Sequence, residues 1–450
     1  MNLDYDLVVI GAGSGGLAAA VRAAGYGARV AIAERAKPGG ACVNYGCIPE
    51  KFLDYAAGFN RLEQVAFSYG WQECPRNFDW LKFNKAKEQH IHHLNEVHLG
   101  HIQEAGVEFL QGHASFLDAH TVMVEGYPVT AEKILISAGA KPTKPNIPGA
   151  EHAITWHELY QLSSQPRSIA VIGADPIGVK IAGSLNALGT QVTHIVSEER
   201  ILSTFDAEIS QEIQNRLIHR GVQFFNKTHV AAIKEERDGF SLTFAGQAES
   251  LIVETVLMDA PRTPNLENLN LDKANIQLSP SGAISINEFS QTSQESVFAV
   301  GDCTERIPLT PSAIAQGRAF ADTEFGGQKR SVSLVWVPIS ISSHPEAATV
   351  GASEAEAHAK FGEAAVCYRT RFRPLLYSFS QIEEKTFIKA IVNRQDQDRL
   401  LGVHMVGDGA VDIIQSLAVA LKLGATKQDL NAAIGIHPSS AEELFSIEAF

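Results

Sequence analysis

Apolar runs and helical stretches alternate in the first part of the chain. Residues 5–10 form an apolar run typical of a buried strand, an alanine-rich stretch after it predicts a helix, and residues 29–33 predict a second strand. The same succession returns at residues 168–172 and 191–196, which predict strands on either side of a helix ending at Leu188. Strand, helix and strand in this order build a parallel sheet, so the pattern predicts two α/β units.

Towards the C-terminus the pattern changes to short strands with one amphipathic helix. Strands are predicted at residues 331–341, 368–372 and 386–393, and the helix at residues 411–423. This block predicts an antiparallel sheet with covering helices, an α+β layer suited to dimerisation. In between, helices are predicted at residues 49–60 and 90–106, and strands at residues 107–110, 133–137 and 297–302.

A glycine-rich turn joins the first predicted strand to its helix. The turn reads Gly11-Ala12-Gly13-Ser14-Gly15-Gly16, and the second strand ends in Glu34, about 18 residues past the last glycine. In such a turn Gly11 reverses the chain, Gly13 lets the backbone approach a pyrophosphate, and Gly16 packs the helix on the strand. The acid at the end of the second strand is placed to bind a ribose. These residues predict a dinucleotide site.

Length and a second turn complete the predicted architecture. At 450 residues the chain is too long for one core, and the proline-rich stretch near residues 145–150 predicts a domain boundary. The second unit has its own turn, residues 173–178, so a second dinucleotide site is expected. The predicted fold class is α/β, with two Rossmann-like dinucleotide-binding domains and a C-terminal α+β dimerisation domain.

Two of the five cysteines share a local motif. Cys42 and Cys47 lie five residues apart in the segment Gly39-Gly40-Ala41-Cys42-Val43-Asn44-Tyr45-Gly46-Cys47-Ile48-Pro49. Few cysteines in a large chain favour redox chemistry over a disulfide framework, so the pair is interpreted as a redox-active dithiol. Cys74, Cys303 and Cys367 are expected to be isolated thiols in the core or at the surface.

Charge and hydropathy exclude several partners. The net charge of −14 argues against nucleic acid and anionic membranes. No apolar run reaches about 18 residues, and the first one breaks at Gly11, so neither a membrane span nor a signal peptide is predicted and a cytoplasmic location is expected. Histidines gather at residues 90–101 without cysteines or carboxylates at ligand spacing, so they are interpreted as a solvated helix face and no metal is expected.

Taken together, these motifs resemble the class I flavoprotein disulfide reductases (pyridine nucleotide-disulfide oxidoreductases), and among them the glutathione reductases. The resemblance covers nearly the whole chain. It implies FAD bound through Gly11, Gly13, Ser14, Gly16, Glu34 and Asp302, a homodimer, and an active site shared between two chains. The segments that carry it are the first turn, the dithiol motif, residues 299–302, residues 309–318 and residues 435–443.

The resemblance also assigns catalytic roles. Cys47 faces the flavin and Cys42 attacks the substrate disulfide. His437, supplied by the partner chain, is the acid/base that protonates the leaving thiol, and Glu442 orients its ring. Ser439-x-x-Glu442 is also a capping box, and the two roles are compatible. Ser14, Arg22 and Arg318 are expected to anchor glutathione carboxylates, whereas His98 stands near the position of a substrate-packing tyrosine.

The second nucleotide site departs from the family at five positions, two of which lie in its turn. Asp175 replaces the middle glycine, which opposes a pyrophosphate by shape and by charge. Pro176 stands where the glutathione reductases have an aromatic gate over the flavin. Ser197 and Ser203 replace two arginines that bind the 2′-phosphate of NADPH, and Pro261 replaces a glycine. The departures predict that NADPH is a poor donor or none, and leave NADH open.

One further departure is paired. The lysine that contacts the flavin in the family falls at Glu50, and its glutamate partner falls at Lys180, so the charges are exchanged. One interpretation is that an anionic group next to the flavin favours its oxidised form. The other is that Lys51 or Lys180 reaches the flavin and nothing changes electronically.

The predicted function is reduction of glutathione disulfide or a related small disulfide by an FAD enzyme, with NADPH use doubtful. Two alternatives stay open, an NAD(P)H-independent dithiol oxidase and a catalytically silent flavoprotein scaffold. The resemblance divides the chain into residues 1–148 (FAD-binding, with the redox disulfide), 149–265 (NAD(P)H-type, with the altered turn), 266–335 (FAD domain continued) and 336–450 (dimerisation).

Overall fold

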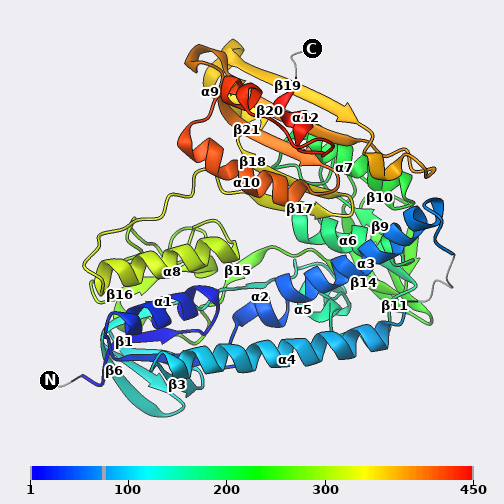
Figure 1. The fold of residues 1–450 in the computed structure, drawn as a ribbon. Coiled ribbons are helices and arrows are strands. Elements are labelled where there is room, and N and C mark those ends of the chain that lie inside the picture. The colour runs from blue at the N-terminus through cyan, green and yellow to red at the C-terminus, as the bar shows by residue number, and fades with distance from the viewer. Residues whose placement is uncertain (1–2, 73–77, 448–450) are drawn as a thin grey trace. The chain divides into compact units, whose positions relative to one another are not determined.

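The computed structural model describes residues 3–72 and 78–447, and Cys74 lies outside them. Its contacts divide the chain into two compact units, each built from three segments. The first unit comprises Met1–Pro49, Leu81–Thr143 and Pro261–Leu334, and the second comprises Glu50–Trp80, Lys144–Ala260 and Val335–Phe450. Each unit thus combines segments far apart in sequence (Figure 1). The four-domain division stays a prediction.

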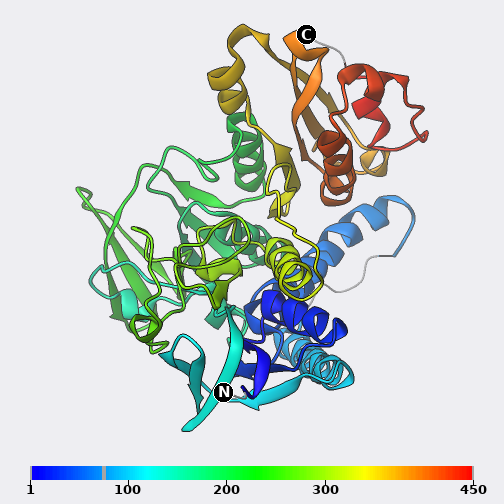
Figure 2. The same ribbon diagram turned by 90° about the vertical axis from the view of Figure 1, so that its left-hand side faces the viewer.

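The first unit is built on a seven-stranded sheet. Leu7, Val8 and Val9 are fully buried because both faces of the sheet are covered. Helices α1 (Ser14–Gly25), α4 (Trp80–Glu104) and α8 (Thr310–Glu324) supply apolar residues to the core on one face. Both views place α8 beside α1 (Figures 1 and 2). The strands follow the order β3 (Glu108–Gln111), β2 (Val30–Glu34), β1 (Tyr5–Ile10), β6 (Tyr127–Ile136), β5 (Thr121–Val124) and β4 (Ala114–Asp118), with β16 (Val297–Ala299) also paired to β6.

Shorter elements complete the first unit. A two-stranded ribbon pairs β7 (Ala140–Pro142) with β15 (Arg262–Pro264). The dithiol segment contains the short helix α2 (Gly40–Asn44) and runs into α3 (Cys47–Ser68), a helix that continues into the second unit.

The second unit contains another parallel sheet. Its strands follow the order β10 (Gln223–Phe225), β9 (Gln191–Ile195), β8 (Ser168–Ile172) and β14 (Thr255–Met258). Helices α5 (Trp156–Leu159), α6 (Pro176–Ala187) and α7 (Ala207–His219) accompany it, as does an antiparallel sheet of β11 (Val230–Glu236), β12 (Gly239–Phe244) and β13 (Ser250–Val253).

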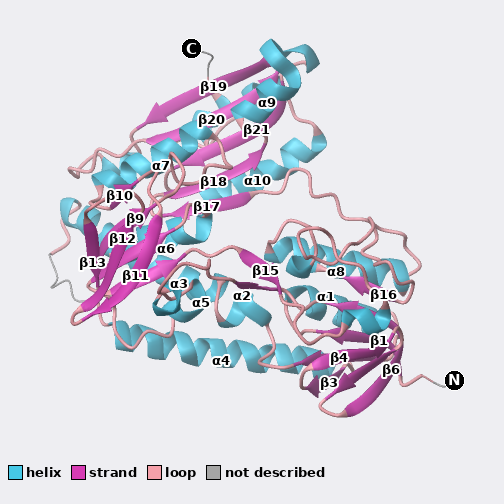
Figure 3. Cartoon of the chain, turned by 180° about the vertical axis from the view of Figure 1, so that it is seen from behind, coloured by secondary structure: helices cyan, strands magenta, loops and turns pink. Residues whose placement is uncertain are grey.

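A five-stranded antiparallel sheet belongs to the same unit, and Figure 3 shows its strands side by side. Helix α6 packs closely on it, because a Cβ on Gly183 would overlap the carbonyl oxygen of His344. The order is β17 (Ile339–Ser343), β18 (Glu346–Gly351), β21 (Arg399–Val406), β20 (Thr386–Asn393) and β19 (Ala365–Phe372), with helices α9 (Glu354–Phe361), α10 (Ala410–Leu423), α11 (Lys427–Ala432) and α12 (Glu442–Phe445).

The predicted α/β fold class is confirmed, whereas several element bounds were wrong. The strand predicted at residues 331–341 begins only at Ile339, because Pro338 lacks the N–H that a ladder needs and Trp336 has φ +64°. The strand predicted at residues 297–302 ends at Ala299 and gives way to a 3-10 turn. The helix predicted at residues 49–60 continues to Ser68, and the helix predicted at residues 90–106 begins already at Trp80. Among the described residues, no helix is long and apolar enough to cross a membrane.

Candidate active site

The first glycine turn has the geometry that its sequence predicts. Gly11 has φ +102°, and a Cβ there would lie 2.6 Å from the carbonyl oxygen of Ser137. A Cβ on Gly16 would overlap the carbonyl oxygen of Gly11, so the helix can approach the strand only with glycine at this position. At Gly13, in contrast, the nearest atom to an added Cβ is the Cα of Gly40 at 3.9 Å, which leaves room for a ligand.

The start of α1 fits the phosphates of a dinucleotide. Gly13 is its N-cap, no side chain caps its first amides, and no acid stands in its first turn. Uncapped amides at a helix N-terminus bind anions. Glu34, at the end of β2, accepts a hydrogen bond from the amide of Ala12 at 2.8 Å. Asp302 is 2.9 Å from Arg262, and burial raises its pKa against the opposing charge of that arginine.

The dithiol segment lies directly on this turn. The amide of Gly39 donates to the carbonyl oxygen of Ala12 at 2.8 Å. A Cβ on Gly40, which has φ +63°, would lie 2.7 Å from the Cα of Gly13. From the other side, Asn95 of α4 donates to the side chain of Asn44 at 3.0 Å. The backbone that carries the cysteines is therefore fixed against the dinucleotide turn.

The four described cysteines differ in their surroundings. Cys42 is half-buried in α2, and Cys47 is exposed at the start of α3, with its Sγ 3.6 Å from the hydroxyl of Thr310. A helix N-terminus favours the anionic thiolate of such a sulfur. Cys303 is buried and Cys367 half-buried, neither forms a disulfide, and burial raises the pKa of each to about 12. The raised pKa values disfavour the thiolate, which is the reactive form, at both positions.

Glu50 and Lys180, the pair with exchanged charges, form an ion pair. The Lys180 Nζ is 3.1 Å from the Glu50 Oε1, and both side chains are mostly buried. Lys51 pairs with Asp54, which also contacts the Nε2 of His344 at 2.9 Å. The exchange has kept the attraction between the partners. Both interpretations of its effect on the flavin stay predictions.

His437 and Glu442 form the contact that an acid/base pair requires. The His437 Nδ1 is 3.0 Å from the Glu442 Oε2 and 3.1 Å from the Oε1. Glu442 and Ser439 also exchange the hydrogen bonds of a capping box, so the glutamate makes both contacts at once, and its role in orienting His437 stays a prediction. The hydrogen bonds from the Ser439 amide and from His437 lower the pKa of Glu442. With Nδ1 directed at the carboxylate, Nε2 is the ring nitrogen that can exchange a proton with a substrate.

The predicted substrate anchors lie on α1 and α8. Ser14 begins α1, and Arg318 is exposed on α8. Arg22 makes a close ion pair with Asp322, which also pairs with Arg330 at 2.7 Å. Burial acts to raise the pKa of Asp322, but hydrogen bonds from Arg22, Tyr26 and Arg330 outweigh it and lower the pKa to about 2. Arg22 therefore has a structural partner, and its substrate role stays a prediction.

The five residues at which the second nucleotide site is expected to differ from the family are placed as follows. Asp175 is the exposed N-cap of α6 and Pro176 its first residue. Ser197 donates to Glu198 at 2.8 Å, while Ser203 is exposed. In the first unit, the carbonyl oxygen of Pro261 accepts from the amide of Thr143.

Asp259 is a residue of this site that sequence reasoning missed. It follows β14, and its Oδ2 accepts hydrogen bonds from the amides of Asp175 at 3.1 Å and Gly178 at 3.0 Å. The only sequence signal was an acid directly after an apolar strand in the second unit.

The histidines of residues 90–101 lie on α4. His92 is mostly exposed and stands 3.4 Å from Glu96, while burial lowers the pKa of His98. Among the described residues, no three His, Cys, Asp or Glu side chains are grouped to hold a metal.

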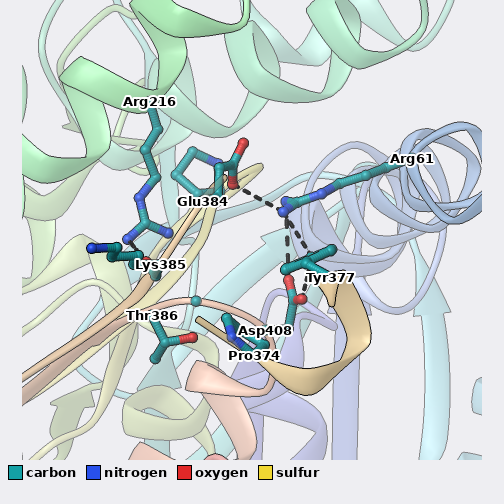
Figure 4. Close-up of a pocket in the computed structure, with 10 residues that line it drawn as sticks. Arg61, Arg216, Pro374, Tyr377, Glu384, Lys385, Thr386 and Asp408 are labelled. Carbon is teal, nitrogen blue, oxygen red and sulfur yellow. Dashed lines mark hydrogen bonds and ion pairs between the residues drawn. The ribbon is translucent and has the colours of Figure 1, made fainter. Parts of the chain in front are cut away.

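A small pocket in the second unit is lined by an ion-pair network rather than by predicted site residues (Figure 4). Glu384 makes two hydrogen bonds of 2.7 Å with Arg220 and one of 2.9 Å with Arg61. Arg61 also donates to the hydroxyl of Tyr377, which donates to Asp408. Burial acts to raise the pKa of Glu384, but Arg220 and the nearby charges outweigh it and lower the pKa to about 2. The network joins α3 and α7 to the C-terminal sheet.

We expect this network to make stability depend on pH. A carboxyl whose pKa falls from 4.5 to about 2 on folding adds roughly 3 kcal/mol above pH 4.5, and this is lost as the pH falls through 2. Glu384→Gln leaves two arginines without their partner, so at pH 7 it is expected to cost about 3–5 kcal/mol. Urea unfolding at pH 7 and pH 3 measures both effects.

Glu199→Gln is the matched control, because the Glu199–Lys227 pair is exposed and should contribute nothing measurable. Equal stability of Glu384→Gln and the wild type at pH 7 would contradict the assignment of the network as a stabilising contact.

Comparison with known proteins identifies the family of the chain. Residues 5–317 match the model of the pyridine nucleotide-disulphide oxidoreductase family, and residues 337–446 match the dimerisation domain of the same family. The chain is 44% identical to a glutathione reductase of Nostoc sp., covering 99% of this chain and 100% of that protein. It is 38% identical to a glutathione reductase of Burkholderia cepacia, covering 99% and 98%.

A solved structure is similar over the same extent. The HOCl-induced flavoprotein disulfide reductase RclA from Escherichia coli matches with a TM-score of 0.89 at 25% identity, covering 98% of this chain and 99% of that one. The family implies FAD and a pyridine nucleotide as cofactors, without distinguishing NADPH from NADH. The chain therefore belongs to the pyridine nucleotide-disulphide oxidoreductases and is a flavoprotein disulfide reductase similar to the glutathione reductases.

Proposed function

We propose that the chain is an FAD-dependent dithiol/disulfide oxidoreductase that reduces glutathione disulfide or a related small disulfide. The observation that carries the proposal is the contact of the dithiol segment with the first glycine turn, through the hydrogen bond between Gly39 and Ala12. FAD bound at that turn would exchange two electrons with the neighbouring sulfur pair. The residues proposed to hold it are Gly11, Gly13, Ser14, Gly16, Glu34 and Asp302, with Glu50, Lys51 and Lys180 near its reactive ring.

The chemistry proposed for the protein's own residues balances. The thiolate of Cys42 attacks one sulfur of the substrate disulfide and forms a mixed disulfide, while the other substrate sulfur leaves and takes a proton from His437. The proton that His437 gives is the one that Cys42 lost on forming its thiolate. Cys47 then loses its proton and attacks the sulfur of Cys42, which closes the internal disulfide, and the second substrate sulfur leaves and takes up that proton as the second thiol. Two electrons and two protons have passed from the dithiol to the two product thiols.

A second copy of the chain is the proposed partner. The side chain of His437 is 83% exposed, and Ile434 and Ile436 beside it are 98% and 82% exposed. Exposed apolar residues next to a proposed catalytic group are typical of a surface that another protein chain covers. The match to the dimerisation domain covers this segment. We infer a homodimer in which His437 serves the dithiol of the other chain. In the reducing cytoplasm, cysteine pairs that form disulfides are usually catalytic rather than structural. We therefore propose a cytoplasmic location.

The proposed enzyme uses NADPH poorly or not at all. Asp175 places an exposed carboxylate at the N-terminus of α6, where a pyrophosphate would have to bind. Ser197 and Ser203 offer no positive charge for a 2′-phosphate. If no pyridine nucleotide reduces the flavin, the cysteine pair and the flavin can catalyse the reverse reaction. A dithiol substrate would then be oxidised, and oxygen or another acceptor would take the electrons. The dithiol oxidase is therefore the second candidate.

Anaerobic stopped-flow mixing tests the proposal. The FAD-loaded protein is mixed separately with NADPH, NADH and a small dithiol, and flavin absorbance is followed. We expect the dithiol to reduce the flavin and NADPH to do so slowly or not at all. Rapid reduction of the flavin at micromolar NADPH would refute only the proposal that NADPH is a poor donor. Failure of every dithiol, together with failure of the reduced protein to release thiol from glutathione disulfide, would refute the proposed function and favour the silent scaffold.

A further inference from the structure

The chain contains two equivalent turns, so the second can be judged against the first. Helices α1 and α6 are each 12 residues long and each follows a glycine turn after a buried strand. Ser137 and Asp259 occupy matching places, since each follows a neighbouring parallel strand. The amide of Ser137 donates to Ile10 at 2.9 Å, and the amide of Asp259 donates to Ile172 at 2.8 Å.

The side chains at this place differ in what they do. The hydroxyl of Ser137 donates to the carbonyl oxygen of Gly11 at 2.7 Å and does not cover the first amides of α1. The carboxylate of Asp259 accepts instead, and takes the amides of Asp175 and Gly178 at the start of α6. In the second turn, the Asp259 carboxylate therefore occupies the amides whose counterparts in the first turn donate to no side chain.

Asp259 also fills the space of the second turn. A Cβ on Gly178 would lie 2.5 Å from the Oδ2 of Asp259, and a Cβ on Gly173 would lie 2.7 Å from its Cβ. The two glycines thus make room for this side chain. Amides at the N-terminus of such a helix are the groups that bind the pyrophosphate of a dinucleotide.

We propose that Asp259 is a built-in anion that occupies the phosphate-binding amides of the second turn and excludes pyridine nucleotides from it. The inference rests on the proposed function, in which NADPH is a poor donor, and names the residue responsible. With pyridine nucleotides excluded, a small dithiol is the reductant that supplies two electrons to the flavin and the cysteine pair. A bound pyrophosphate would have to displace the carboxylate from its two amides and would meet the charge of Asp175 as well. The amides of the second turn are thus occupied by a side chain of the protein itself.

The test copies the first turn into the second. Asp259→Ser supplies the side chain of Ser137, and the double variant Asp175→Gly with Asp259→Ser also restores the middle glycine. Titration calorimetry on the FAD-loaded protein measures NADH and NADPH binding. We expect at least 10-fold tighter NADH binding for the single variant and at least 100-fold, about 2.8 kcal/mol, for the double variant. NADPH should gain less, because Ser197 and Ser203 remain.

Asp238→Ser is the matched control, since it removes the same charge from an exposed turn between β11 and β12 and should leave binding unchanged. If Asp259→Ser does not fold, Asp259→Asn keeps the shape, removes the charge and should still bind NADH more tightly. Unchanged affinity in the folded variants, with only their unfolding altered, would show that Asp259 is merely a helix cap and overturn the inference. So would wild-type protein that binds NADH or NADPH at micromolar concentration.

The two proposals fail separately. Reduction of the flavin by a dithiol does not involve Asp259 and should be unchanged in Asp259→Ser. Absence of that reaction in the wild type, together with failure of the reduced protein to release thiol from glutathione disulfide, refutes the proposed function, whereas unchanged nucleotide affinity in the variant refutes only the role of Asp259.

Discussion

Cys47→Ser is expected to lower disulfide reduction by at least about 10³-fold, and Cys42→Ser by a similar factor, the scale on which loss of a nucleophile acts. Serine keeps the size of the side chain but gives no thiolate at neutral pH and forms no disulfide, so the two-electron exchange is interrupted at either position. Release of thiol from glutathione disulfide by the reduced FAD-loaded protein measures the effect.

Cys367→Ser is the control for this substitution. Burial raises the pKa of the Cys367 thiol to about 12, so it carries no thiolate at neutral pH, and its loss should leave the rate unchanged. Wild-type turnover in Cys42→Ser or in Cys47→Ser would contradict the assignment of these sulfurs.

His437→Gln is expected to lower kcat by roughly 10²–10⁴-fold, because a positioned acid/base contributes on this scale. Glu442→Gln keeps the capping box, which glutamine also makes with Ser439, but removes the charge that holds the ring through its Nδ1. We therefore expect a smaller loss of kcat, about 10-fold, with KM and urea unfolding unchanged. Steady-state kinetics of both variants gives the comparison.

His92→Gln is a matched control, because His92 is also mostly exposed and also stands beside a glutamate, Glu96. It should retain wild-type kinetics. If His437→Gln behaves in the same way, the proposed acid/base role is wrong. If Glu442→Gln changes unfolding rather than kcat, the glutamate is only a cap.

Local patterns predicted much of the fold and of the first turn, for physical reasons. Buried parallel strands read as continuous apolar runs, and the conformation of Gly11 excludes other side chains, so both are visible in sequence. The prediction of a strand at residues 331–341 was wrong because it followed the apolar residues and disregarded Pro338. Proline has no N–H to donate, so strand pairing begins only after it, at Ile339.

What sequence could not predict depends on contacts between distant segments. Asp259 acts on Asp175 and Gly178, more than 80 residues away, and becomes visible only when β14 and β8 lie side by side. Arg22 contacts Asp322, which is 300 residues further on, and no local pattern indicates this partner. The ion pair of Glu50 with Lys180, in contrast, was expected from the resemblance, although no local pattern in the sequence indicates it.

If a flavin and one sulfur pair share electrons, the protein must take up the electrons of both groups, and a reductive titration counts them. In an anaerobic titration with a strong one-electron reductant, the FAD-loaded wild type should take up about four electrons per chain, two for the flavin and two for the disulfide. Cys47→Ser should take up about two. Uptake of two electrons by both proteins would contradict the account.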